Sequence, residues 1–107
     1  DPNGQLNKQG GYTSAIYFSS ANINQNDTYG ESLIDKGTAA GGCIEVYNTV
    51  EDAEKRNAYL SVFDGGALGV GSHNVVRTIV VRTSDGLTAT QQKDLESEII
   101  NELVELR

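Results

Sequence analysis

The chain contains one thiol, Cys43, and one imidazole, His73. Such a pair can supply a nucleophile and a general base if the fold brings the two side chains within hydrogen-bonding distance. Neither residue lies in a recognisable catalytic motif, and a cysteine in a strand is usually a small buried residue with an inert thiol. We therefore interpret Cys43 as a packing residue and His73 as a surface residue.

A glycine-rich segment, residues 65–72 (GGALGVGS), superficially resembles a phosphate-binding loop. A phosphate loop follows a strand and precedes a helix, so that helix amides point at the anion. Here the predicted order is reversed, and the Gly-Lys-Ser/Thr signature is absent. We interpret the segment as a flexible connection. An alternative function, a small ligand-binding or enzymatic domain, would use this loop together with Cys43 and His73.

The asparagine-rich loop that begins at Asn22 could suggest calcium binding. An EF-hand loop requires glycine at its sixth position and glutamate at its twelfth, but these positions hold Asp27 and Leu33. A looser oxygen-ligand site that includes Glu31 and Asp35 stays open. One cysteine and one histidine cannot provide the spacing of a zinc site. We predict no cofactor, no metal and no catalytic residue.

Length and charge limit the class of protein. The chain has 107 residues, the size of one domain, and 15 acidic against 8 basic residues give a net charge of −7. An acidic surface disfavours nucleic acid and anionic membranes as partners. Residues 1–11 are polar and glycine-rich, unlike a signal peptide. Methionine is absent, so we expect a mature or excised piece of a longer precursor.

Apolar patterns predict alternating strands and helices after a polar arm. Residues 1–11 form a linker or disordered arm, and residues 12–107 form a single domain. Strand-forming residues predict strands over 12–20, 43–47 and 74–83. The last is apolar on both faces, which indicates a central position.

Two capped helices complete the predicted domain. Asn48 or Thr49 can cap the first helix, and Thr88 with Gln91 forms a capping box before the second, whose wide apolar face contains Leu95. These elements predict an α+β fold: a two-layer sandwich in which a three- to four-stranded, mostly antiparallel sheet carries both helices on one face.

Four polar residues on the predicted strands are the candidate interaction or structural residues: Arg77, Arg82, Glu45 and Tyr47. Arg77 is placed on the same strand face as Val75, where an unpaired buried charge would be costly. We therefore expect one of the two arginines to pair with Glu45 across the sheet.

Several short motifs carry a resemblance to a known family. They are Glu45-Val46-Tyr47, Glu51-Asp52-Ala53, Arg56, Val80-Val81-Arg82-Thr83, Leu87-Thr88 and Gln91. With them, residues 12–106 resemble the C-terminal domain of cell-surface lipoproteins of Gram-positive, often gut-dwelling, bacteria, a family without an assigned activity. Arg77 departs from the small residue expected at its position.

The resemblance implies export and attachment through a lipid anchor upstream of this chain, with no catalytic residues to carry over. We therefore expect a non-enzymatic, extracellular interaction or accessory domain of a cell-surface lipoprotein. Its partner would be an unknown protein or cell-envelope component, contacted at a sheet face or edge. Nucleic acid is not expected as a partner, and the membrane would be reached only through the anchor.

Overall fold

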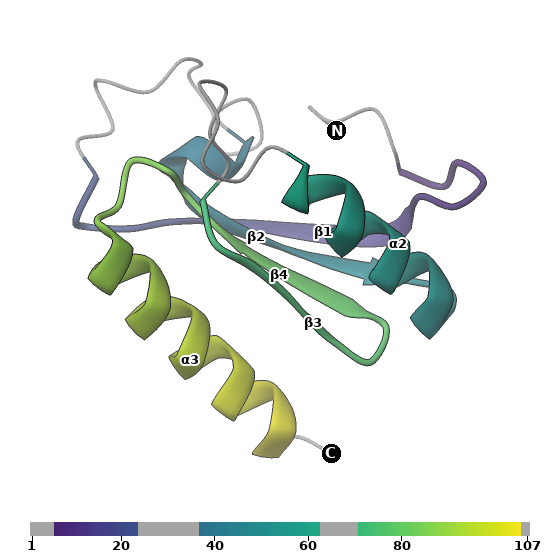
Figure 1. Cartoon of the computed structure of the whole chain (residues 1–107). Helices are drawn as coiled ribbons and strands as arrows, with labels where there is room; N and C mark the ends of the chain where they lie inside the picture. The colour runs from purple at the N-terminus through teal and green to yellow at the C-terminus, as the bar shows by residue number, and fades with distance from the viewer. Residues whose placement is uncertain (1–5, 24–36, 63–70, 106–107) are drawn as a thin grey trace.

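The computed structural model describes residues 6–23, 37–62 and 71–105. In these ranges four strands form one antiparallel sheet with the order β1-β2-β4-β3 (Figure 1). The predicted α+β class and antiparallel sheet are thereby confirmed. The strands are β1 (Tyr12–Ser19), β2 (Gly41–Tyr47), β3 (His73–Val76) and β4 (Ile79–Thr83); the helices are η2 (Gly37–Ala40, a 3-10 turn), α2 (Val50–Ser61) and α3 (Ala89–Glu105).

The two long helices lie on opposite faces of the sheet, whereas the sequence led us to place both on one face (Figure 1). On β3, His73 contacts Asn57 of α2, and the next residue, Asn74, contacts Glu96 of α3. Successive residues of a strand point to opposite faces. We call these the α2 face and the α3 face.

The predicted strand over 74–83 is wrong, because the chain turns back within it. β3 and β4 form a hairpin in which Val76 pairs with Ile79, and Arg77 lies in the turn. Arg77 has φ 56°, a left-handed conformation that glycine adopts without strain. Arg77 therefore projects from an exposed turn and does not share a strand face with Val75.

Both predicted helix caps are present. Thr49 Oγ1 accepts a hydrogen bond from the Asp52 amide at 3.1 Å. At α3, Thr88 Oγ1 accepts from the Gln91 amide at 3.1 Å, and the Thr88 amide donates to Gln91 Oε1 at 2.9 Å. These capping bonds satisfy amides that a helix start leaves unpaired, and they fix the residue at which each helix begins.

The hydrophobic core fills the α2 face. Its buried members are Tyr12, Tyr47, Ala53, Leu60 and Val80. The rings of Tyr12 and Tyr47 meet edge to face, with centroids 6.0 Å apart, an arrangement that aromatic pairs favour. Both buried rings lie on the β1–β2 half of the α2 face.

Some predictions concern segments outside the described residues. The looser oxygen site with Glu31 and Asp35 lies in one such segment, and residues 65–70 of the glycine-rich loop lie in another. Residues 6–11, part of the predicted arm, form turns in which the Asn7 amide donates to the Tyr12 carbonyl at 2.8 Å.

Candidate functional site

Three of the four predicted polar residues meet beneath α2, in a cluster centred on Glu45. The Glu45 side chain is fully buried, and its Oε1 accepts a hydrogen bond from Tyr47 Oη at 2.8 Å. Its Oε2 accepts from Arg82 Nη1 at 3.1 Å. The expected ion pair between an arginine and Glu45 across the sheet is therefore present, with Arg82 as the partner.

A fourth member, Arg56, comes from α2. Its Nε donates to Glu45 Oε1 at 3.2 Å and its Nη2 donates to Oε2 at 3.5 Å. We did not predict this role for Arg56, although the sequence carries a signal for it. Arg56 follows Ala53 by three residues and precedes Leu60 by four, so it falls on the buried stripe of the helix. A charge at such a position needs a partner under the helix.

The Glu45 cluster, which consists of Glu45, Tyr47, Arg56 and Arg82, is centred on a fully buried carboxylate, and its two arginine side chains are only 15% and 10% exposed. Every buried side-chain nitrogen and oxygen in the described ranges has a hydrogen-bond partner. Burial and the neighbouring Glu45 carboxylate both raise the pKa of Tyr47, so its hydroxyl stays protonated as a donor. We conclude that the cluster fastens α2 to the sheet.

Cys43 and His73 do not form a catalytic pair. Both lie on the α2 face, but they pair with the same residue of β4, Arg82, from opposite sides, so a whole strand separates them. Burial, reinforced by the Glu45 carboxylate, raises the pKa of Cys43 to about 12, which keeps the thiol protonated and inert. His73 Nδ1 is 2.7 Å from Asn57 Oδ1.

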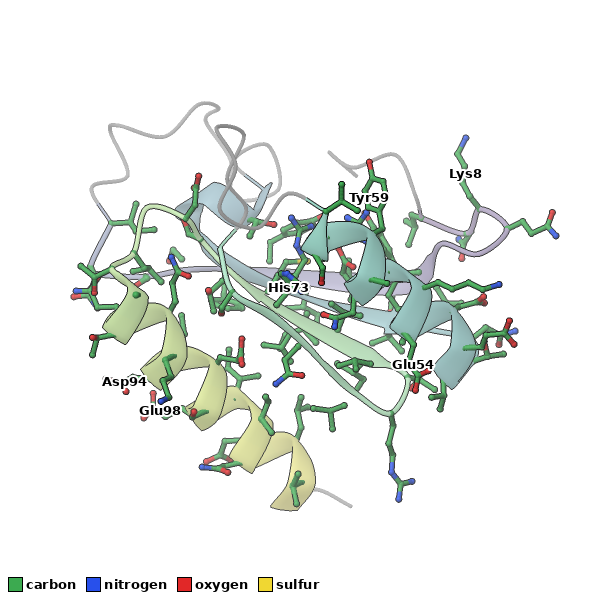
Figure 2. All side chains as sticks on the ribbon, in the orientation of Figure 1. Lys8, Glu54, Tyr59, His73, Asp94 and Glu98 are labelled. Atoms are coloured by element: carbon green, nitrogen blue, oxygen red, sulfur yellow. The ribbon has the colours of Figure 1, made fainter. Side chains whose placement is uncertain are left out.

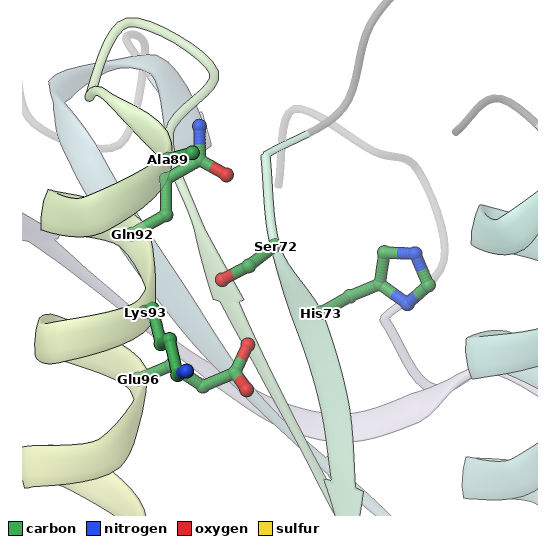
Figure 3. A pocket seen from close by; sticks show the side chains of 6 residues that line it. All are labelled: Ser72, His73, Ala89, Gln92, Lys93 and Glu96. Atoms are coloured by element: carbon green, nitrogen blue, oxygen red, sulfur yellow. The ribbon is translucent and has the colours of Figure 1, made fainter. Parts of the chain in front are cut away.

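A polar groove of about 340 Å³ lies between β3 and the start of α3, lined by Ser72, His73, Ala89, Gln92, Lys93 and Glu96 (Figure 3). In Figure 3 the Ser72 side chain points toward α3, and the His73 ring points toward α2. Ser72 Oγ lies 2.6 Å from Thr83 Oγ1. The serine and histidine side chains therefore diverge, and the groove does not assemble a nucleophile with a base.

A second groove, which we call the apolar groove, lies on the α3 face. It has a volume of about 360 Å³ and is lined by Ile44, Leu95, Glu98, Ile99, Glu102 and Leu103. Ile44 pairs with Ile16 of β1, whose side chain is 60% exposed. Leucine and isoleucine thus form the walls of an open surface, and two carboxylates lie among them.

Within residues 6–23, 37–62 and 71–105, no second helix covers the α3 face, because α2 lies on the other face and α3 packs mainly against β4 and β3. The β1–β2 half of this face carries Ile16, Phe18, Ile44 and Val46, none of which is fully buried. On the other face, the corresponding half carries the buried residues Tyr12 and Tyr47. A contiguous apolar surface of this kind on a small domain is typical of an interaction site.

Comparison of the chain with protein-family models, with curated proteins and with solved structures gave no match. Among residues 6–23, 37–62 and 71–105, no helix is long and apolar enough to span a bilayer. The same part of the chain holds no group of three or more histidine, cysteine, aspartate or glutamate residues placed to bind a metal ion.

Proposed function

We propose that this chain is a non-enzymatic interaction domain of an extracellular, cell-surface lipoprotein, and that it binds a protein partner of the cell envelope through its α3 face. The observation that carries the proposal is the exposure of Ile16 beside the apolar groove. The extracellular setting and the anchor rest on the sequence resemblance described above.

The distribution of polar and apolar side chains supports a binding role over a catalytic one. Glu45, Arg56 and Arg82 bind one another beneath α2 in the Glu45 cluster. The β1–β2 half of the α3 face leaves apolar side chains accessible, and it has a rigid floor because β2 is paired on both sides. A rigid apolar surface binds with little loss of conformational entropy, which favours recognition.

Site-specific photocrosslinking tests this proposal. A benzophenone amino acid replaces Ile16 on the α3 face or, as a matched control, Tyr59, which is 55% exposed on α2. Each variant is irradiated in its native host. We expect a discrete crosslinked envelope protein from position 16 that is missing from position 59. Equal crosslinking at the two positions, or none at position 16, would refute the proposal.

A further inference from the structure

We propose that the partner presents an amphipathic, basic α-helix, which lies beside α3 in the apolar groove and completes the helical layer on the α3 face. This inference rests on the proposed function and specifies the chemistry of the partner. Three observations carry it: the width of the open surface, its apolar floor and the sign of the charges along it.

The width of the open surface fits one helix. An α-helix with its side chains is about 10 Å wide and neighbouring strands are about 4.8 Å apart, so one helix covers about two strands. Among the described helices, α3 lies against β4 and β3, which leaves a strip two strands wide over β1 and β2. A helix parallel to α3 fills this strip.

The floor of this strip is suited to a helix with an apolar face. Ile16 and Ile44 are paired neighbours on adjacent strands, and the wall formed by α3 offers Leu95, Ile99 and Leu103. The spacing of these three residues, four apart, is that of one helix face. Apolar side chains at i, i+3, i+4 and i+7 of the partner would meet both surfaces, as in other helix-in-groove complexes.

Charge selects the partner. Glu98 and Glu102 also line the apolar groove and are one helical turn apart; both are exposed. Figure 2 shows Glu98 projecting from α3. Lysine or arginine on the flank of the bound helix would face these carboxylates. A second copy of this chain would bring its own two carboxylates, and an anionic membrane would bring phosphates, so both are disfavoured.

Peptides of defined composition test the inference. A helical peptide with leucine at i, i+3, i+4 and i+7 and lysine on its flanks is titrated into the whole protein by calorimetry. The matched control peptide carries glutamate in place of each lysine. We expect binding of the lysine peptide only. Tight binding of both peptides, or of neither, would overturn the inference.

Protein variants locate the binding. The double variant Glu98→Lys/Glu102→Lys should weaken binding of the lysine peptide about tenfold or more, since it reverses two exposed charges. The control Glu54→Lys/Asp85→Lys has the same change in net charge away from the groove and should leave affinity unchanged. If both double variants weaken peptide binding equally, the loss of affinity is caused by net charge alone, and the proposal is contradicted. Ile16→Asp should also weaken binding, and circular dichroism confirms that each variant is folded.

The remaining outcomes separate the inference from the function on which it rests. If position 16 still crosslinks an envelope protein that the lysine peptide does not displace, the interaction domain stands and the basic helix is refuted. Binding to phosphatidylglycerol vesicles, or a dimer in sedimentation velocity that Ile16→Asp dissociates, would assign the surface to a membrane or to a second copy and would likewise refute the helix.

Discussion

Replacement of Glu45 by glutamine should destabilise the protein more than any surface substitution. Glutamine keeps the size of the side chain but removes the carboxylate that both Arg56 and Arg82 bind. The two arginine side chains are 15% and 10% exposed, so water can replace the lost charge only in part. Two guanidinium groups would then repel each other beneath α2.

The magnitude follows from the cost of breaking a buried ion pair, which is about 3–5 kcal/mol when one partner is removed. A domain of this size is stable by roughly 5–15 kcal/mol. With a urea dependence of roughly 2 kcal/mol per molar, the midpoint of unfolding should fall by about 2 M. Urea titration followed by circular dichroism measures this shift.

A matched substitution provides the reference. Glu51 pairs with Lys55 on the outside of α2, where the side chains are 76% and 72% exposed, and solvent screens such a pair so that it contributes little to stability. Glu51→Gln should therefore shift the midpoint only slightly. If the two glutamine variants unfold at the same urea concentration, the Glu45 cluster does not hold α2 on the sheet. Should Glu45→Gln fail to fold, Tyr47→Phe, which removes one hydrogen bond, should still cost about 1 kcal/mol.

Three further predictions concern single residues. Cys43 should react with a thiol reagent at pH 8 about a thousandfold more slowly in the native protein than in urea, because burial raises its pKa from 9.0 to about 12. Equal reaction rates in the two conditions would contradict this burial. The same pKa shift lowers the free energy of unfolding as the pH rises above 9, since the thiol ionises less readily in the folded state than in the unfolded state. Arg77→Gly should stabilise the protein by about 0.5–1 kcal/mol, measured by urea titration, by relieving the left-handed turn; a loss of stability would show that the arginine side chain matters more than its backbone. Gly42→Ala should destabilise by about 1–3 kcal/mol, because the added methyl group would overlap the Phe18 ring and the Arg82 carbonyl; an unchanged thermal midpoint would rule out this close packing.

The local elements could be predicted from the sequence because their signals are local. The Thr88–Gln91 capping box and the strand-forming run from Tyr12 each depend on neighbouring residues only. The hairpin was missed because its turn lacks the expected glycine. Arg77 holds a left-handed conformation that arginine rarely adopts, and the run of valines on both sides of it suggested one continuous strand.

The placement of the helices could not be predicted because β2 and β4 are apolar or partly buried on both faces. Cys43 and Tyr47 are buried beneath α2, while Ile44 and Val46 are half-buried on the α3 face, so alternation does not identify one inward face. The Glu45–Arg82 pair could be predicted because it depends only on strand pairing. The apolar groove could not be predicted, since it arises from the position of α3 over β4 and β3.

The most direct test of the interaction surface is a methyl NMR titration with the lysine-containing helical peptide. We expect the methyl resonances of Ile16, Ile44 and Ile99 to shift with a common affinity, while those of Val80, buried on the α2 face, stay in place. Shifts concentrated at Val80, with Ile16 and Ile44 unchanged at saturating peptide, would contradict it.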